Sequence, residues 1–382
     1  MNSQRKQFVA HFVYPYLFRT GSWLYYLIAF QKRYRPFVFT GVSENLELFP
    51  FDEIFDLTSF SKARITCERA IKRLLGTYPT HWVRLFSKRP ATIHSHFGDG
   101  ALSQMLISRA LGVPHVVSFY GADATKIPKD PCMQGRYRDL FKQAAAVLAE
   151  GPYMAQTLQE LGCPRDRIHV IHLGVPVADY SFRARNGSEV VRILIASTFT
   201  EKKGVVDGLL ALQKVKEPFE LTLVGDAPAS NAGALSYKAS VEETLKDCSF
   251  PVRRLGYISP DALKAELLRA DILLHPSRHA ADGDAEGGFP VVLTEMAATG
   301  GLIVGTRHCD IPEIAKEGVN ATLAREGDAD DIAAAIERLL SWSERWSDMS
   351  QQARKIVTSD FEASNQARKL ESLYDVVLEG AV

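Results

Sequence analysis

The chain has 382 residues, which at about 150 residues per domain indicates two domains and room for a short appendage. Hydrophobic residues make up 46% and charged residues 24% of the chain, values that exclude a disordered tail, a collagen-like rod and a disulfide-stapled miniprotein. Lysine plus arginine (45) balances aspartate plus glutamate (45), so no global charge indicates a nucleic-acid partner, although residues 1–180 are net +8 and residues 181–382 net −8. This asymmetry suggests different partners for the two halves.

Cysteine usage and the N-terminal segment bear on the compartment. The five cysteines are scattered without metal-binding or disulfide-framework spacing, which favours a reducing cytoplasm. The apolar stretch over residues 1–30 is interrupted by His11 and Arg19, so no run reaches the roughly 18 apolar residues that a spanning helix needs. It also lacks the cleavage site of a signal peptide. We therefore expect a cytoplasmic protein.

Short apolar runs alternate with helical patterns along the chain. The runs that predict strands in the first half are 8–13, 36–40, 92–95, 115–118 and 146–149, with helical patterns at 100–111 and 153–161. A polar segment, 181–189, contains an Asn-Gly and predicts a domain linker. Strand patterns then resume at 191–197, 221–225, 271–275 and 302–306, and a last helical pattern covers 361–378. This alternation predicts two α/β domains with parallel sheets, whose strands end at a ligand-binding cleft.

The segment GGFPVVLTEMAATGG, residues 287–301, predicts a short helix over 290–299. Pro290 suits the first helical turn and Gly300 suits the C-terminal cap. The free N–H groups at such a helix start can bind an anion, and Glu295 lies where it can reach a ligand across that start. A capped surface helix with an exposed glutamate is the alternative.

Three other segments admit both a functional and an ordinary interpretation. In HPSRHAADGDAEGG, residues 275–288, alternating carboxylates suggest a metal site, but the calcium-loop pattern is incomplete, and a solvated acidic loop is favoured. In ASTFTEKKG, residues 196–204, Lys203 either binds a phosphate at the start of the following helix or is an ordinary solvated loop lysine. HSHFGDGALS, residues 94–103, imitates a dinucleotide fingerprint without its distal acid, so it predicts a turn bordering the cleft. Motifs of serine hydrolases, P-loop NTPases and zincins are absent from the sequence.

Taken in order, the segments HSHFG, LGVPHVVSFYGAD, IHLGVP, EKKG, LHPSRHAADGDAEGGFPVVLTEMAATG and HCDIPEI resemble the family 4 glycosyltransferases, over about residues 8–345. The resemblance is strongest to bacterial exopolysaccharide-type members. It implies a GT-B fold: an acceptor-binding Rossmann-like domain at 1–182, a nucleotide-sugar-binding one at 190–358, and a C-terminal helix, 359–382, that packs back on the first domain. It also implies retention of anomeric configuration, with no metal and no cofactor beyond the donor substrate.

The resemblance also implies roles for individual residues. Lys203 matches the lysine that meets the donor pyrophosphate, Glu295 the glutamate that binds the ribose, and Glu286 the glutamate near the donor sugar. Other matches are Gly288, Phe289, Pro290 and Val291 as donor contacts, Gly21 near the pyrophosphate, and His96, Tyr120 and Asp123 as acceptor or cleft candidates.

The sequence departs from the family pattern at three positions. Glu286 precedes Glu295 by nine residues rather than eight. Thr198 stands where the family often has an arginine, which removes a positive charge that Lys202 or Arg278 would have to replace. Tyr120 stands where many members have histidine.

The sequence therefore predicts a retaining glycosyltransferase that moves a sugar from a nucleotide-diphosphate sugar to a glycan or lipid-linked acceptor in cell-surface polysaccharide synthesis. The alternatives are a transferase for a small soluble acceptor and a non-catalytic sugar-nucleotide-binding subunit of a polysaccharide assembly complex. No nucleic-acid partner is expected. Residues 60–90 hold eight basic residues against the single acid Glu68. These basic residues, which lie within 62–89, indicate either a solvated helix face or a patch that binds anionic lipid at the inner face of the membrane.

Overall fold

A computed structural model of the protein describes residues 6–229 and 231–380. By internal packing the chain divides into two units, which are described separately. The first unit runs to Gly174 and includes the segment from Ala363 onward, and the second is Val175–Glu362. The domains expected from the sequence include residues 1–5 and 381–382, which lie outside the described residues.

The first unit is built on a seven-stranded sheet with strand order β3-β2-β1-β4-β5-β6-β7. All neighbouring strands pair in parallel. Parallel sheets are covered on both faces, so their strands read as apolar runs. The strands are β1 (Phe8–Phe12), β2 (Arg35–Phe39), β3 (Ile54–Phe55), β4 (Thr92–His96), β5 (His115–Ser118), β6 (Ala146–Ala149) and β7 (Ile168–Val170).

The second unit repeats this architecture with a six-stranded parallel sheet of order β10-β9-β8-β11-β12-β13. Its strands are β8 (Val191–Ala196), β9 (Phe219–Val224), β10 (Val252–Gly256), β11 (Ile272–His275), β12 (Leu302–Thr306) and β13 (Ala321–Ala324). The chain order reverses between β8 and β11, because β9 and β10 lie on one side of β8 and β11, β12 and β13 on the other. Ligands of doubly wound sheets bind at the carboxyl ends of strands at such a reversal.

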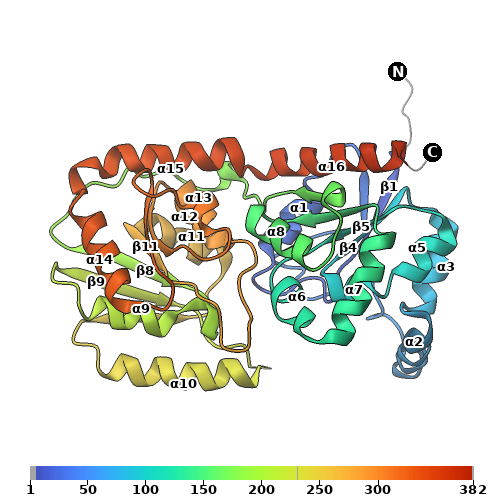
Figure 1. Ribbon diagram of the computed structural model, residues 1–382, viewed down its shortest axis with the longest axis horizontal. Coiled ribbons are helices and arrows are strands. Elements are labelled where there is room, and N and C mark those ends of the chain that lie inside the picture. Colours follow the sequence, from blue (N-terminus) through green and yellow to red (C-terminus); the bar gives the residue numbers. More distant parts are fainter. Residues whose placement is uncertain (1–5, 230, 381–382) are drawn as a thin grey trace. The chain divides into compact units, whose positions relative to one another are not determined.

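Helices connect the strands in both units (Figure 1). In the first unit they are α1 (Ser22–Ala29), α2 (Lys62–Leu75), α3 (Pro79–Lys88), α4 (Gly98–Ala101), α5 (Met105–Leu111), α6 (Ala122–Thr125), α7 (Pro131–Gln143), α8 (Pro152–Glu160) and α16 (Ala363–Glu379). In the second they are α9 (Val205–Leu212), α10 (Ala232–Lys246), α11 (Pro260–Arg269), α12 (Val291–Ala298), α13 (Ile311–Ile314), α14 (Ala329–Leu340) and α15 (Trp346–Asp360). The single helix expected over 100–111 is wrong, because α4 and α5 are separate. None of the described helices is both long and apolar enough to cross a bilayer.

The polar segment expected as a linker, residues 181–189, packs within the second unit. Arg185 is completely buried. Its guanidinium donates hydrogen bonds to the carbonyl oxygens of Leu267 and Ala270, at 2.8 and 2.9 Å, and to the carbonyl oxygen of Thr299. These carbonyls lie at the C-terminal ends of α11 and α12, where a cation is favourable. The arginine therefore fixes this segment against two helix ends.

The C-terminal helix α16 packs on the first unit, which confirms the expectation from the family resemblance. The carboxylate of Glu371, 1% exposed, accepts hydrogen bonds from the backbone N–H groups of Lys32 and Arg33, both at 2.6 Å. Tyr374 reaches the sheet and contacts His94 at 2.6 Å. Polar contacts thus join α16 to both the loop after α1 and strand β4.

Buried histidines in the first unit should make the protein sensitive to acid. Burial lowers the pKa of His11, His81 and His115 to about 3. In the unfolded chain the pKa of a histidine is about 6.5. The unfolded chain therefore binds more protons below that pH. The stabilising contribution of these neutral histidines should be complete above pH ~6.5 and fall by about 1.4 kcal/mol per pH unit per histidine below it.

Urea unfolding between about pH 7 and pH 5 measures this dependence. His81 lies among the rings of Phe39 and Phe55, with centroids 5.3 and 5.6 Å away. His81→Phe keeps a ring in this position, so it should reduce the pH slope by one histidine's share. The same slope in His81→Phe as in the wild type would contradict the assignment.

Candidate functional site

Two loops at the carboxyl edge of the second sheet form the centre of the site. Lys203 ends a short 3-10 turn, Glu201–Lys203, between β8 and α9. Gly204 follows with φ +62°, and a Cβ atom there would lie 1.9 Å from the carbonyl oxygen of Pro276. Only glycine permits this approach. The backbone N–H of Arg278 donates to the carbonyl of Lys202 at 2.9 Å, so the loop after β8 and the loop after β11 are held together.

This contact places Lys203 beside Glu286. The Nζ atom of Lys203 lies 2.8 Å from Oε2 of Glu286, and the side chains are 15% and 7% exposed. The hydroxyl of Ser277 donates to Oε1 of Glu286 at 2.8 Å. Burial by itself would raise the pKa of Glu286, but the charges of Lys203 and Lys202 outweigh it and hold this pKa well below its usual range. Glu286 is therefore a buried anion held by a cation and a hydroxyl.

A second ion pair lies beside the first. Nζ of Lys202 is 3.0 Å from Oδ1 of Asp284. Burial opposes the charge of Lys202, yet Glu286 and Asp284 together raise its pKa. Asp282 accepts a hydrogen bond from the backbone N–H of Asp284 at 2.9 Å. The carboxylates weighed as metal ligands from the sequence are thus engaged with lysines or with backbone in the structure.

The helix expected at 290–299 is α12, with Pro290 as its N-cap and Gly300 just beyond its C-cap at φ +80°. Phe289 is buried and contacts the ring of Phe361 with centroids 5.4 Å apart, so only its backbone remains available to a ligand. The carbonyl of Gly288 accepts a hydrogen bond from the N–H of Asp310 at 3.1 Å. Val291, the first residue of α12, is half-buried.

Glu295 contacts Tyr180, whereas Glu286 contacts Lys203. It is buried within α12 and accepts a hydrogen bond from the Tyr180 hydroxyl at 2.9 Å. Burial raises its pKa despite Tyr180 and the charge of Lys264. The alternative of an exposed glutamate on a surface helix is therefore wrong. Tyr180 was not expected as part of the site, since its position relative to Glu295 depends on packing between segments far apart in sequence.

The positions that depart from the family pattern are also accounted for. Thr198 is half-buried in the loop after β8 and carries no charge. Arg278, one candidate to replace the missing cation, forms an ion pair with Asp207 at 3.2 Å. Lys202, the other candidate, is close enough to Glu286 to lower its pKa. Both candidates are thus paired with carboxylates, Lys202 with Asp284 and Arg278 with Asp207.

A pocket of about 290 Å³ lies at the ends of β8, β9 and β10. Sequence reasoning did not identify it, because its walls come from three strands. It is lined by Phe199, Leu223, Gly225, Asp226, Arg254 and Gly256.

The candidates in the first unit form two groups. Asp123 is buried and accepts hydrogen bonds from the backbone N–H groups of Gly98 at 2.9 Å and Tyr120 at 3.0 Å; burial raises its pKa to about 6. It therefore holds the loops after β4 and β5. His96 instead contacts the Tyr120 hydroxyl through Nδ1 at 2.5 Å. Gly21 is the N-cap of α1, where a Cβ would meet the side chain of Leu17 and the carbonyl oxygen of Phe18, both at 2.9 Å.

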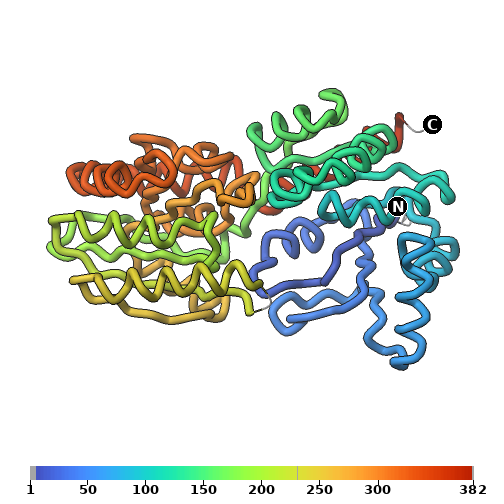
Figure 2. Tube along the Cα trace, turned by 60° about the horizontal axis from the view of Figure 1, so that its bottom comes forward, coloured from blue at the N-terminus to red at the C-terminus, as the bar shows by residue number. Residues whose placement is uncertain are grey.

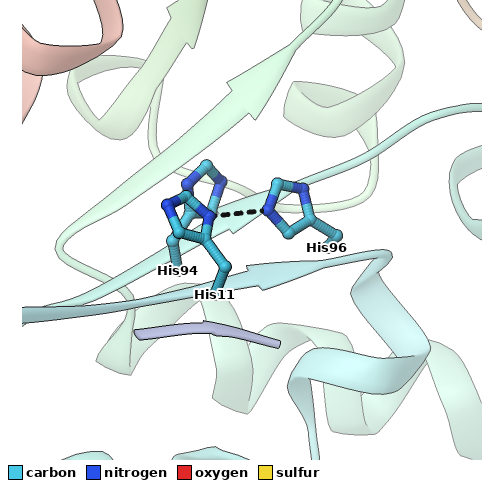
Figure 3. A group of neighbouring side chains, drawn as sticks. All are labelled: His11, His94 and His96. Carbon is cyan, nitrogen blue, oxygen red and sulfur yellow. Dashed lines mark hydrogen bonds between the residues drawn. The ribbon is translucent and has the colours of Figure 1, made fainter. Parts of the chain in front are cut away.

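Two groups of side chains within the described residues have the spacing of metal ligands. His11, His94 and His96 are buried on neighbouring strands, with ligand atoms within 4.8 Å of one another (Figure 3). The second group is His279, His308 and Cys309. There, Glu326 contacts Nδ1 of His279 at 2.9 Å and Nδ1 of His308 at 3.0 Å, while Nε2 of His308 accepts the N–H of Glu286 at 3.2 Å. This second group therefore supports the backbone of Glu286.

Comparison with family models covers most of the chain. The model described as Glycosyl transferases group 1 matches residues 179–356, and that described as Glycosyltransferase Family 4 matches residues 18–179.

Two curated relatives are similar in sequence. The amylovoran biosynthesis glycosyltransferase AmsK of Erwinia amylovora is 34% identical over 250 residues, 64% of this chain and 60% of the relative. The putative colanic acid biosynthesis glycosyltransferase WcaL of Escherichia coli K12 is 30% identical over 291 residues, 73% of this chain and 69% of the relative. The match thus spans three fifths to about two thirds of the length of these relatives.

Solved structures share the architecture. Anabaena HepE, in a complex with UDP, has a TM-score of 0.76 at 16% identity and covers 97% of this chain and 100% of its own. Sucrose-phosphate synthase of Thermosynechococcus elongatus has a TM-score of 0.77 at 13% identity, covering 98% and 100%. At these identities the likeness concerns the fold alone, and it confirms the expected GT-B class with two Rossmann-like parallel-sheet units.

The buried ion pair predicts a stability effect that the sequence did not suggest. From its loop position, Lys203 is expected to matter for turnover and little for stability. The structure changes this expectation, because Lys203→Met leaves Glu286 buried without its nearest cation. Breaking a buried pair costs about 3–5 kcal/mol, and Lys202 should reduce that cost. We expect Lys203→Met to lower the free energy of unfolding, and Lys203→Met/Glu286→Gln to recover part of the loss.

Urea unfolding of the two variants and the wild type measures this coupling. Lys214→Met, which removes a lysine from an exposed pair with Asp330, is the matched control and should change little. Equal stability of Lys203→Met and Lys214→Met would show that the Lys203–Glu286 pair does not support the fold.

Proposed function

Because the chain belongs to the family 4 glycosyltransferases, also described as glycosyl transferases group 1, we propose that it transfers a sugar from a nucleotide-diphosphate sugar to a glycan or glycolipid acceptor, with retention of configuration. The names of AmsK and WcaL suggest a place in exopolysaccharide synthesis. The observation that carries the proposal is the Lys203–Glu286 pair at the carboxyl edge of the second sheet. A phosphate-binding cation and a buried carboxylate are thereby held at the edge where such sheets bind ligands.

The proposed chemistry uses these fixed charges. When the bond between the sugar C1 and the diphosphate oxygen breaks, negative charge develops on the leaving diphosphate. The ammonium of Lys203 and the N–H groups at the start of α12 stabilise that charge. The acceptor hydroxyl forms its bond to C1 on the same face, and its proton passes to the leaving phosphate oxygen. The anionic Glu286 stabilises the positive charge on the sugar or binds its hydroxyls.

The remaining donor contacts follow from the same placement. Glu295, held by Tyr180, binds the ribose hydroxyls. The pocket lined by Phe199 and Arg254 takes the base. Gly288 and Val291 offer backbone to the phosphates or the sugar. No metal or further cofactor takes part in this scheme.

A panel of nucleotide-diphosphate sugars, screened by thermal shift and then by release of the nucleotide diphosphate with and without EDTA, tests this proposal. Slow release without acceptor, unaffected by EDTA, supports a metal-independent transferase. Loss of activity in EDTA that manganese restores would overturn the metal-free scheme. Binding without turnover would instead favour the non-catalytic sugar-nucleotide-binding subunit. Turnover with small soluble sugars but not with lipid-linked ones would favour a soluble acceptor.

Glu295→Gln should weaken donor binding. The substitution replaces a charged acceptor of the ribose hydroxyls by an amide, and a hydrogen bond to a charged group contributes about 1.5–3 kcal/mol. We expect roughly a tenfold or greater increase in the donor Kd, measured by calorimetry. The control is Tyr180→Phe, which removes the protein's own hydrogen bond to Glu295 and should have a smaller effect. Unchanged donor affinity in Glu295→Gln would remove Glu295 from the ribose site.

We further propose that the enzyme is cytoplasmic and binds an anionic membrane surface through α2 and α3. These helices lie beside each other in the first unit (Figure 2). Glu68 is the one buried residue of α2. Its carboxylate accepts a hydrogen bond from the backbone N–H of Thr80 at 3.2 Å. Two outward faces of α2 remain exposed: Lys62, Arg69 and Arg73 on the basic face, and Ala63, Cys67, Ala70, Ile71 and Leu74 on the apolar one. Leu74 is 84% exposed and, on α3, Val83 is 72% exposed.

Neighbouring basic and apolar faces are typical of helices that lie in a membrane interface. Lys72 does not belong to the basic face, because its ammonium lies 4.5 Å from the ring centre of Tyr14 and 4.7 Å from that of Tyr78. Leu85 is also excluded from the surface, since it is completely buried. Each exposed basic residue near anionic lipid contributes about 1 kcal/mol, so three of them with Leu74 give reversible attachment.

Sedimentation with anionic and with neutral vesicles measures this attachment. Wild type should bind anionic vesicles, and binding should weaken with salt. Lys62→Ser/Arg69→Ser/Arg73→Ser should abolish it without changing donor affinity. The matched control removes the same charge from α7, by Arg136→Ser/Arg138→Ser/Lys142→Ser, and should still bind. Equal sedimentation of the two triple variants, or no sedimentation of the wild type, would overturn the membrane proposal.

A further inference from the structure

The buried strands of the first unit carry a chain of histidines that the proposed donor site does not use. His11 lies on β1, and His94 and His96 lie on β4 (Figure 3). All three are at most 2% exposed. Each of their six ring nitrogens contacts a side chain: His11 contacts Gln31 and His96, His96 contacts Tyr120, and His94 contacts Tyr374 and Ser118. Burial lowers the pKa of all three far below neutrality, so each ring has one donor and one acceptor nitrogen.

Gln31 sets the direction of the first branch. Its Nε2 lies 3.1 Å from the carbonyl oxygen of Leu27, which identifies that atom as the amide nitrogen, because a side-chain oxygen there would face another acceptor. The same Nε2 lies 3.1 Å from Nε2 of His11. Since an amide nitrogen only donates, Nε2 of His11 accepts, and its hydrogen is on Nδ1.

The remaining hydrogens of this branch follow. Nδ1–H of His11 donates to Nε2 of His96 at 3.0 Å, so the hydrogen of His96 is on Nδ1. That group donates to the Tyr120 hydroxyl at 2.5 Å. The phenolic oxygen of Tyr120 is therefore an acceptor at the end of the branch.

A second branch runs from α16 to Ser118, two residues before Tyr120. The buried Tyr374 hydroxyl lies 2.6 Å from Nδ1 of His94, which is its hydrogen-bond partner among the described residues. A buried hydroxyl hydrogen without an acceptor is costly, so Tyr374 donates and His94 carries its hydrogen on Nε2. That group donates to Ser118 at 2.8 Å, and Ser118 lowers the pKa of Tyr120 against the larger effect of burial. The first branch thus directs its hydrogens to the Tyr120 hydroxyl, and the second directs its hydrogens to Ser118.

The surroundings of Tyr120 suit a sugar ring. It follows β5 at the carboxyl edge of the first sheet and is half-buried. The rings of Trp23 and Phe97, also half-buried, have centroids 4.6 and 4.9 Å from its own. Phe97 has φ +71°, a costly conformation for a bulky residue that is characteristic of functional sites. Burial keeps the Tyr120 phenol protonated by raising its pKa.

We propose that Tyr120 is a specificity-determining donor for an oxygen of the carbohydrate substrate, and that the branch from Gln31 fixes its hydrogen in the outward direction. The hydroxyl accepts from His96 and keeps its own hydrogen for a ligand oxygen, beside the rings of Trp23 and Phe97. Gln31 and His11 are positioning residues. This inference rests on the proposed glycosyltransferase function and names a substrate contact in the first unit.

The hydrogen positions are tested directly by long-range ¹H–¹⁵N spectra of the histidine-labelled full chain near neutral pH. We expect neutral rings with hydrogen on Nδ1 of His11 and His96 and on Nε2 of His94. The opposite tautomer at His11 or His96 would overturn the proposal. So would stoichiometric zinc in the purified protein held by these rings, because ring nitrogens that bind metal cannot form the chain.

The substrate contact is tested by kinetics with a nucleotide sugar that the wild type turns over. Tyr120→Phe keeps the ring and should lower kcat/KM by about tenfold or more, as for loss of a hydrogen bond of at least about 1.4 kcal/mol. Tyr25→Phe, which removes a phenol that donates to the carbonyl of Pro50 in the same unit, is the matched control and should retain wild-type values. Equal kcat/KM for wild type and Tyr120→Phe would overturn the proposal.

A double-mutant cycle separates positioning from general stability. Gln31→Met removes the donor that sets the direction, so it should mix the His11 tautomers and lower kcat/KM. In the Tyr120→Phe background it should have no further effect, because no phenolic hydrogen remains to be directed. Multiplying losses would show a merely structural role for Gln31. Failure of the proposed function is distinct from these results, since the wild type would then turn over no nucleotide sugar while the tautomers were unchanged.

Discussion

The burial of one carboxylate, Glu286, organises the second unit. A buried anion is tolerated only where a cation and hydrogen-bond donors compensate for the lost water. Lys203 and Ser277 supply these groups. The loop after β8 and the loop before α12 must therefore stay together, and Gly204 is the position at which the backbone permits this. The same arrangement keeps a lysine ammonium at the edge where an anionic donor is proposed to bind.

The first unit also buries polar side chains, but these are neutral histidines and not ions. Strand β4 carries two histidines in a fully covered sheet, where a lone polar ring would be costly. Hydrogen bonds to neighbouring strands and to Tyr374 of α16 satisfy them. The same neutral network that lets these histidines be buried is expected to make the unit sensitive to acid, and it is proposed to give the Tyr120 hydroxyl a defined direction. Stability and substrate recognition are thus expected to depend on the same rings.

The two units also differ in what they leave uncovered. Most helices bury an apolar face against a sheet, but α2 buries little beyond Glu68. Its apolar residues Ile71 and Leu74 remain outside, beside a basic face. Because an exposed apolar face next to positive charge is typical of an interaction surface, an anionic lipid surface is the partner proposed for it. The surplus positive charge of the first half of the sequence is concentrated on this segment.

The sequence by itself determined the class of fold and many of its elements, although it did not predict strands β3, β7, β10 and β13. Apolar runs predicted most of the larger strands, Pro290 and Gly300 bounded α12, and the ordered motifs indicated the family. Local signals of this kind are carried by residues close together in the chain. They did not show that residues 100–111 form two helices, where the carbonyl of Ser103 lies against Gly76 and Asp123 holds Gly98.

Tertiary structure alone decided which side chains meet. It paired Lys203 with Glu286 and Glu295 with Tyr180, and it turned Lys72 inward onto two aromatic rings. It buried Arg185, which the sequence placed in a linker, because this guanidinium satisfies carbonyls at the ends of α11 and α12. The physical reason is that burial and hydrogen-bond satisfaction depend on neighbours far away in the chain, which periodicity and spacing do not encode.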